Sequence, residues 1–527
     1  MLFARIFVDR RSAAAILLIA LAVLGAFAPR AKAQAVAIAE LDGYVTDPSG
    51  QAIAGAQVKA TEVDKGQVRD TVSEATGRYA LPDLPVGNYR LEVSAAGFKT
   101  YVQTGIILQV ASNVTVNVPM QIGAVTESIR VEANAAMVET KENSVAQVIN
   151  EQSMIDLPLN GRNPTQLLTL TGAGTSTMTL NGGDLTGSKN IQGSNGSGQF
   201  SVAGSQANGI NFLLDGGDNN DSFSNVNLPI PVPDFIQEFN VQTNGLPAQY
   251  GLHPGGVVNI VTKSGANAFH GDLFDFLRNG DLNARPEGAA TTQPKRDTLK
   301  RNQFGGTAGG RIIKDKLFFF GGYQGTRQRS DPSQSTAYVP TAAVLQGNFS
   351  VIDASKANGG CLAKAVQLKS PSGVAYPGNM IPISSFDPAG FKLASSYLPV
   401  SPQACGAVQY GYLADNPDDQ WIGRIDYIIS DKHSLYGRYY IYDYLGEVLF
   451  DGANALTTGT SGNKDRAETL TLGDTFTLGP TQVNSLHATF DRRRDDRADA
   501  SNMFSPNTLG ANMWEALPNY TQLTVSG

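Results

Sequence analysis

Residues 250–279 have the sequence YGLHPGGVVNIVTKSGANAFHGDLFDFLRN, in which a glycine pair precedes an apolar run and a turn. The run Val257–Val261 is rich in Val and Ile, which is typical of a strand buried on both faces. Gly265–Asn267 supplies the turn chemistry that ends this strand, and a second, aromatic strand follows it. The residues alone therefore predict a buried strand that leads directly into another strand.

The beginning of the chain predicts export. Arginines precede an apolar run from Ala13 to Phe27, and Ala31-Lys32-Ala33 before Gln34 has the small-x-small form that signal peptidase cuts. We expect cleavage between Ala33 and Gln34, with residues 1–33 as the signal peptide. A retained membrane anchor is the alternative, but the run is shorter than the roughly 20 apolar residues that a spanning helix needs.

Composition limits the class of protein. A chain of 527 residues should hold more than one domain, and its formal net charge is −7. The short run Arg492–Arg494 reads as a solvated strand end or loop, and no longer basic block occurs, so nucleic acid is not an expected partner. No apolar stretch after Phe27 is long enough for a spanning helix, so membrane embedding would require strands closed into a barrel.

Residues 36–120 predict an all-β sandwich of about seven strands, because turn residues recur about every ten positions between short alternating runs. The segments GYVTDPSGQAIAGAQVKAT and GRYALPDLPVGNYRLEVSAAGF resemble carboxypeptidase-regulatory-like domains, which are grouped with carbohydrate-binding-like folds. A zinc carboxypeptidase would need a metal site. The histidines have no Glu or second His at a ligand spacing; they are His253, His270, His433 and His487.

The second half of the chain predicts long antiparallel strands. The candidates are 268–278, 303–313, 317–327, 421–429, 435–444, 469–478 and 483–492. Tight turns alternate with long polar segments between them, as in outer-membrane barrels. From Trp421 every second residue is apolar or Gly, whereas Arg424 and Asp426 face the other side. A soluble antiparallel sandwich alternates too, but the signal peptide and the long loops favour the barrel.

Strand 268–278 is the exception to this alternation, because Asp272 and Asp275 fall on opposite faces.

Several segments together resemble one family. They are LPLNGRN at 157–163, NFLLDG at 211–216, residues 250–279, and the segments 301–327 and 419–440. All are similar to TonB-dependent receptors of the Oar-like kind. This resemblance implies a mainly β protein with an N-terminal β-sandwich, a plug domain and a partial transmembrane antiparallel β-barrel. The expected domains are the sandwich at 36–120, a connector at 121–134, the plug at 135–264 and the barrel at 265–527.

Two further segments of the plug have distinct patterns. Residues 235–242 alternate, with one apolar face and one largely polar face, which predicts a strand. Residues 181–208 are rich in Gly, Ser and Asn and would alone suggest a linker. Within this family we expect them to form a plug loop inside the lumen.

The resemblance also implies a function. We expect an outer-membrane receptor or transporter, surrounded by lipid, that takes up an unidentified ligand such as an oligosaccharide, a peptide or a chelate. Its partner would be a TonB-type energy transducer in the periplasm, and no cofactor is expected. A surface carbohydrate-binding or adhesion protein without transport is the alternative. An enzyme such as a secreted peptidase has less support, because the sequence has no Gly-x-Ser-x-Gly elbow.

By the same resemblance, a short connector segment is the TonB box that contacts the transducer. It comprises Thr126, Glu127, Ser128, Ile129, Arg130 and Val131. The segment has the Glu-x-Ile-x-Val form of such boxes and lies between sandwich and plug. Extended backbone can add to a sheet edge of the partner, with Ile129 and Val131 filling pockets. The last strand of the sandwich or a plain linker are the alternatives.

The only cysteines, Cys361 and Cys405, lie in the long polar segment between Arg327 and Trp421. Export to an oxidising compartment allows a disulfide between them. Closing a loop of about 45 residues would stabilise it by roughly 3 to 4 kcal/mol on chain-entropy grounds. Two free thiols are the alternative.

Asp215, Asp218 and Asp221 offer oxygen atoms that could line a calcium site. They miss the EF-hand spacing, so we expect a polar plug loop there.

The end of the chain departs from the family pattern. Plugged outer-membrane transporters close with about 22 strands, whereas we count about seven or eight here. An open sheet edge in lipid would leave unpaired backbone groups, each costing several kcal/mol. Val525-Ser526-Gly527 also lacks a terminal aromatic residue. A truncated or fragmentary gene product is the first expectation, and a small barrel of about eight strands is the second.

Overall fold

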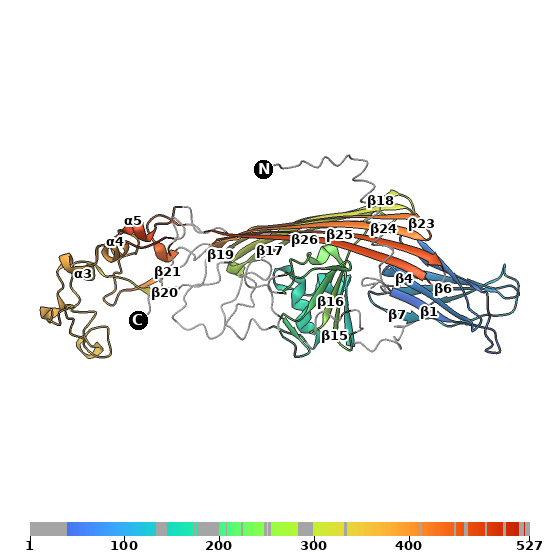
Figure 1. The fold of residues 1–527 in the computed structure, drawn as a ribbon, viewed down its shortest axis with the longest axis horizontal. Coiled ribbons are helices and arrows are strands. Elements are labelled where there is room, and N and C mark those ends of the chain that lie inside the picture. Colours follow the sequence, from blue (N-terminus) through green and yellow to red (C-terminus); the bar gives the residue numbers. More distant parts are fainter. Residues whose placement is uncertain are drawn as a thin grey trace, which may run out of the picture.

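The chain forms an elongated molecule in which one long sheet runs beside a smaller sheet and reaches a β-sandwich at one end (Figure 1). The computed structural model describes residues 39–527 apart from 133–144, 173, 177–199, 207, 223–224, 247–249, 251–254, 283–298, 331–334, 411–413, 447–449, 458–461, 480–481, 499–501, 516–520 and 522–527. The predicted signal peptide, with Ala33 and Gln34, lies outside the described residues, as does most of the loop predicted at 181–208. Among the described residues, no helix is long and apolar enough to cross a membrane.

The sandwich, residues 39–132, consists of two sheets that share one core. The first contains β4 (Arg78–Leu84), β1 (Ala39–Thr46) and β7 (Asn113–Thr115), and β8 (Val118–Pro119) also pairs with β1. The second has the order β3 (Val68–Val72), β2 (Gln57–Glu62), β5 (Gly87–Ser94), β6 (Thr100–Leu108) and β9 (Ser128–Glu132). Alternate residues of β5 fill the core; these are Tyr89, Leu91 and Val93.

The plug, residues 145–264, contains a five-stranded mixed sheet. Its order is β10 (Val145–Asn150), β15 (Ile236–Asn244), β16 (Val257–Thr262), β13 (Asn211–Leu214) and β14 (Gly217–Asp218). All six residues of β16 are buried, as residues 250–279 predict. Around the sheet lie helix α2 (Glu151–Asp156), the 3₁₀ helices Asn160–Arg162, Pro164–Thr171 and Pro233–Phe235, and the strand pair β11 (Gly174–Ser176) and β12 (Phe200–Val202).

The polar face predicted for 235–242 is also buried. Glu238, Asn240 and Gln242 are at most 8% exposed. Val110, which follows β6 of the sandwich, covers this face of β15: its N–H donates to Glu238 Oε2 at 2.7 Å, and its carbonyl accepts from Asn240 Nδ2 at 3.2 Å. The polar residues on β15 therefore serve an internal contact.

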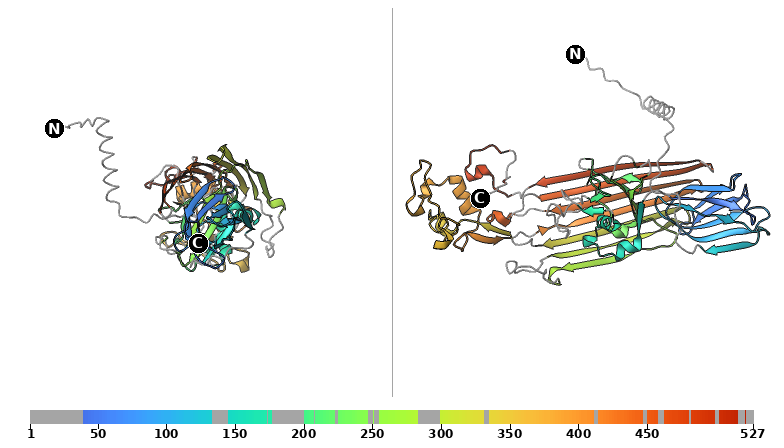
Figure 2. Two further views of the ribbon diagram at one scale, coloured as in Figure 1. Left: turned by 90° about the vertical axis from the view of Figure 1, so that its right-hand side faces the viewer. Right: turned by 90° about the horizontal axis from the view of Figure 1, so that it is seen from below.

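The wall is a long antiparallel sheet with the order β17-β18-β19-β23-β24-β25-β26, with the short β22 (Ala414–Asp415) beside β19. Its long strands are β17 (Leu273–Asn279), β18 (Lys300–Ile313), β19 (Leu317–Ser330), β23 (Asp418–Ser430), β24 (His433–Gly446), β25 (Gly462–Gly479) and β26 (Gln482–Ala498). These match the strands expected from the sequence. Among the described residues the sheet does not close, because β17 and β26 each pair on one side only. Figure 2 shows the plug against one face of the wall.

The last two strands of the wall are longer than the predicted 469–478 and 483–492. The extension is polar, and cross-strand ion pairs hold it: Arg493 Nη2 lies 2.8 Å from Asp465 Oδ2. The run Arg492–Arg494 lies inside β26 near its end. Charge alone therefore did not mark the end of a strand.

The wall has an apolar outer face and a polar inner face. Along β23 the outward side chains of Trp421, Ile425, Tyr427 and Ile429 are 39%, 45%, 41% and 39% exposed. Arg424 and Asp426 point inward to the plug, and Asp426 is 8% exposed. The alternation predicted for 421–429 is thus present in the structure, as lipid outside and plug inside would require.

Short turns and long loops lie at opposite ends of the wall (Figure 1). The turns after β18 and β23 lie at the sandwich end. The loops at the other end contain β20 (Ser335–Tyr338), β21 (Ala407–Tyr410), α3 (Ala342–Leu345), α4 (Pro388–Ser396), α5 (Pro506–Leu509) and the 3₁₀ helices Lys356–Asn358, Pro377–Asn379, Ile383–Ser385 and Ala455–Thr457. A further 3₁₀ helix, Gly280–Leu282, follows β17. Tyr397 stacks on Phe504 with ring centroids 4.2 Å apart, so loops from different hairpins pack together.

Candidate functional site between plug and wall

Asp215 lies at the centre of the contact between plug and wall. It forms, with Gly216, the two-residue turn between β13 and β14, and the two residues have φ angles of 50° and 80°. Asp-Gly suits such a turn because both positions need positive φ, which Asp tolerates and Gly adopts freely. The turn directs the Asp215 carboxylate into the wall, where the residue is only 2% exposed.

Two arginines of the wall bind this carboxylate. Arg424 Nη1 lies 3.1 Å from Asp215 Oδ1, and Arg438 Nε lies 3.1 Å from Asp215 Oδ2. The plug adds its own donor, since the Thr262 N–H donates to Asp215 Oδ1 at 2.8 Å. Both carboxylate oxygens are therefore satisfied, which is the condition for burying a charge without a large penalty.

The two arginines also face each other. Arg424 of β23 and Arg438 of β24 are directly paired in the antiparallel register. Like charges in opposite positions repel. Asp215 inserts between them, while Arg424 Nη2 also pairs with Asp426 Oδ1 at 2.9 Å and Arg438 Nη2 donates to Thr471 Oγ1 at 2.7 Å. The plug thus supplies the counter-charge that this part of the wall needs.

A second contact joins the plug to the first strand of the wall. Arg162 is buried, pairs with Asp234 of the plug, and lies with its Cζ atom 4.7 Å and 4.0 Å from the ring centroids of Phe274 and Phe276. Gln303 Nε2 donates to the carbonyl of Gly161 at 3.1 Å. Both aromatic residues of β17, two positions apart on one face of the strand, therefore lie against a cation of the plug.

The sandwich covers the other side of the Asp215 cluster. A cavity of about 90 Å³ lies where the three parts meet. Its lining includes Lys65 and Asp83 of the sandwich, Asp215 of the plug, and Arg424, Asp426 and His487 of the wall. The site is therefore a small polar junction that can hold charges together.

Glu238 at the sandwich–plug contact is a buried acid. Burial raises its pKa from 4.5 to about 7, and the hydrogen bond from Val110 N–H opposes this rise only in part. Between pH 4.5 and 7 the folded protein therefore binds more protons at this group than the unfolded chain does. Stability is full below this window and falls as pH rises through it.

We predict that Glu238→Gln removes this pH dependence. The wild type should lose about 2.5 kcal/mol more unfolding free energy than the variant between pH 5 and pH 8, because one pKa unit corresponds to about 1.4 kcal/mol and the unfolded chain is already partly ionised at pH 5. Urea unfolding of both proteins in detergent at the two pH values measures the difference. Glu74→Gln, at an exposed position of the sandwich, is the control and should keep the wild-type slope. Equal slopes for wild type and Glu238→Gln would contradict the prediction.

The predicted TonB box lies at the edge of the sandwich. Ser128–Glu132 form β9, which pairs in parallel with β6 and places Ile129 opposite Tyr101 and Val131 opposite Gln103. Its beginning is fastened by the ion pair of Lys99 Nζ with Glu127 Oε2 at 2.9 Å. In this structure the segment therefore forms the last strand of the sandwich, which was one of the alternatives for it. The outer edge of β9 pairs with no other described strand.

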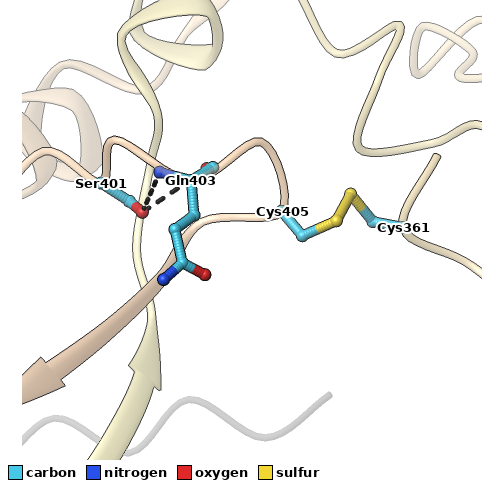
Figure 3. The surroundings of a disulfide bond; sticks show 4 residues. All are labelled: Cys361, Ser401, Gln403 and Cys405. Atoms are coloured by element: carbon cyan, nitrogen blue, oxygen red, sulfur yellow. Dashed lines mark hydrogen bonds between the residues drawn. A yellow bond between two sulfur atoms is a disulfide. The ribbon is translucent and has the colours of Figure 1, made fainter. Parts of the chain in front are cut away.

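The predicted disulfide partners lie together in the long loop between β19 and β23. Cys361 and Cys405 are joined, with a Cα–Cα distance of 5.5 Å (Figure 3). Next to Cys405, Ser401 Oγ accepts from Gln403 N at 3.1 Å and donates to Ala407 O at 2.8 Å. The Ser401 hydroxyl thus fixes the backbone that carries one cysteine.

The other acidic residues of the plug loop do not join Asp215. Asp218 is exposed, and its Oδ1 accepts from Asn220 N at 3.2 Å. Among the described residues, no group of three or more His, Cys, Asp or Glu could hold a metal ion. The sequence marked Asp215 as a possible calcium ligand and Arg424 as inward-facing, but it gave no sign that they meet. Arg438 was missed, although a charged residue in an alternating aromatic strand was a usable signal.

Two family matches cover most of the chain. Residues 261–527 match the family described as outer membrane beta barrel domain, and residues 40–121 match the carboxypeptidase regulatory-like domain. The chain is 28% identical over 287 residues to the TonB-dependent transporter Oar of Myxococcus xanthus. That alignment covers 53% of this chain and 26% of the relative, so the chain spans about a quarter of the length of this curated relative.

Solved structures show partial similarity. The outer membrane transporter YddB from Escherichia coli has a TM-score of 0.39 and 12% identity, covering 66% of this chain and 38% of that one. The siderophore receptor PirA from Acinetobacter baumannii has a TM-score of 0.37 and 14% identity, covering 68% and 41%.

Proposed function

Because the chain belongs to the outer membrane beta barrel domain family and is an Oar-like TonB-dependent receptor by sequence, we propose that it is an outer-membrane transporter whose plug moves to admit a ligand. The curated relative to which the chain is 28% identical is a transporter by name. The ligand is an oligosaccharide, a peptide or a chelate. A TonB-type transducer in the periplasm supplies the energy, and outer-membrane lipid surrounds the wall.

The observation that carries this proposal is the polar attachment of the plug. Asp215 binds Arg424 and Arg438 through ion pairs. An apolar core of similar size would resist separation, because water cannot replace buried carbon contacts. Ion pairs can be exchanged for hydration when water enters, so a plug held this way is suited to repeated release.

The alternative of a carbohydrate-binding adhesin has less support. In that alternative the front sandwich would recognise an external carbohydrate. The sandwich lies at the short-turn end of the wall, opposite the long loops (Figure 1). Outer-membrane barrels turn their long loops outward and their short turns to the periplasm. This orientation puts the sandwich on the periplasmic side, away from external ligands.

We predict that residues 123–133 contain the transducer-binding segment. A peptide of these residues should bind the periplasmic domain of the transducer, because extended backbone can add to an exposed sheet edge. Ile129→Pro should abolish binding, since proline removes a backbone donor and fixes φ. Isothermal titration of both peptides measures this. Ala124→Ser, outside the six-residue box, is the control and should bind like the wild type. Equal binding of the wild-type and Pro peptides, or no binding by either, would exclude the assignment.

Energy-dependent uptake is the test of the proposed function. Cells that produce the protein are incubated with a panel of labelled oligosaccharides, peptides and ferric chelates, with and without a protonophore. We expect at least one label to accumulate inside energised cells and to remain outside when the proton gradient is dissipated. Surface binding that is unaffected by the protonophore, without accumulation of any label, would favour the adhesin instead.

A further inference from the structure

A chain of alternating charges runs from the sandwich through the wall into the plug. Lys65 Nζ lies 3.8 Å from Asp426 Oδ1, and Asp426 accepts from Arg424 at 2.9 Å. Arg424 lies 3.1 Å from Asp215, which in turn lies 3.1 Å from Arg438. Three parts of the molecule that are distant in sequence therefore share one ionic cluster.

The sandwich also limits how much water reaches this cluster. Lys65, Gln67, Asp83 and Pro85 of the sandwich line one side of the 90 Å³ cavity above Asp215, which has room for only a few water molecules. Two unit charges about 4 Å apart attract each other several times more strongly in a partly buried site than in bulk water. Moving the sandwich away would open this cavity to the periplasm and weaken the pairs of Asp215.

We propose that the sandwich is a removable seal over the plug anchor, and that its undocking is the step that loosens the plug. The inference rests on the proposed function for one premise, that the plug moves during transport. β9 is one edge of the five-stranded sheet, and β3, which carries Arg69, is the other edge; Lys65 lies in the turn between β2 and β3. A force that pulls on β9, which contains most of the predicted TonB box, acts first on the sandwich. It therefore affects Asp215 by undocking the sandwich from the wall and plug.

A small set of contacts holds the seal in its docked position. Arg69 donates to the carbonyl of Asp431 and, at 3.2 Å, to Ser434 Oγ, both next to the turn between β23 and β24. The N–H of Asn267 donates to the carbonyl of Asp64 at 2.9 Å. Gly66 fits closely against the turn after β18, since a Cβ atom there would lie 2.9 Å from Asp315 Oδ1. Polar turn contacts of this kind can separate without unfolding the sandwich core.

Hydrogen exchange at two amides tests the proposal in the full chain in detergent. The Asn267 N–H, bound to Asp64, reports docking of the sandwich, and the Thr262 N–H, bound to Asp215, reports the plug anchor. In Lys65→Ala/Arg69→Ala, and separately in Gly66→Trp, we expect both amides to exchange at least tenfold faster. The exposed pair Lys59→Ala/Arg90→Ala on the same sandwich is the control and should exchange like the wild type.

A cross-link separates undocking from the loss of charge. Gly66→Cys with Asp315→Cys places two thiols across the contact, because a Cβ atom at Gly66 would lie 3.4 Å from Asp315 Cγ. When these cysteines are oxidised in the Lys65→Ala/Arg69→Ala background, exchange at Thr262 should return to the wild-type rate. Fast exchange at Asn267 with unchanged Thr262 would overturn the proposal. Unchanged exchange at both amides, or fast Thr262 exchange in the cross-linked protein, would overturn it as well. None of these measurements depends on transport, so the result for the seal and the result for the proposed transport function can be told apart.

Discussion

Asp215→Ala is expected to detach the plug from the wall. The substitution leaves Arg438, which is 1% exposed, without a carboxylate partner, whereas Arg424 keeps its pair with Asp426. Removing one partner of a buried ion pair costs about 3–5 kcal/mol, because the remaining charge is neither paired nor hydrated. Proteolysis of the plug in outer-membrane vesicles, followed against denaturant concentration, should show this loss.

Two further variants make the Asp215 result interpretable. Asp218→Ala removes an exposed carboxylate from the same hairpin and should change stability by less than about 0.5 kcal/mol. The double variant Asp215→Leu/Arg438→Met removes the carboxylate together with the buried arginine that depends on it, and it should recover most of the lost stability because Arg424 keeps Asp426 as its partner. A plug as resistant in Asp215→Ala as in Asp218→Ala would show that the cluster does not anchor it.

Loss of the Cys361–Cys405 bond is expected to loosen the long loop between β19 and β23. The bond closes a loop with a sequence separation of 44 residues. The chain-entropy relation gives about 3 to 4 kcal/mol for a loop of this size. In Cys361→Ser/Cys405→Ser, protease should therefore cut within 335–410 much faster than in the wild type, while the plug keeps its resistance. The wild type treated with reductant is the matched control and should behave like the double variant.

Thiol alkylation before reduction tests the bond directly. Protein taken from the outer membrane should resist labelling at Cys361 and Cys405 until reductant is added. Quantitative labelling of both cysteines without reductant would refute the disulfide.

Periodicity in the sequence predicted the wall well but could not predict its partners. Alternation along β23 assigned Arg424 and Asp426 to the inner face, because side chains on a strand repeat every two residues. Both arginines meet Asp215, which lies 209 positions from Arg424 and 223 positions from Arg438 in the sequence. A local pattern carries no information about contacts at such separations. The anchor therefore required the three-dimensional structure.

Two local features of the structure have the same physical origin. The polar face of β15 is buried, because Glu238 and Asn240 bind the backbone of Val110 from another part of the chain. β26 continues beyond the predicted end at residue 492, because Arg493 pairs with Asp465 across the sheet. In both cases a neighbouring element supplied the partner that a polar residue would otherwise have found in water.

The facing arginines of β23 and β24 have a consequence for the order of assembly. A hairpin that brings two cations opposite each other pairs poorly until an anion lies between them. The anion, Asp215, belongs to the plug, which precedes both arginines in the chain. The plug is then a template on which this hairpin closes. Barrels that already contain their plug are therefore favoured, because in an empty one Arg438 would be buried without a carboxylate partner.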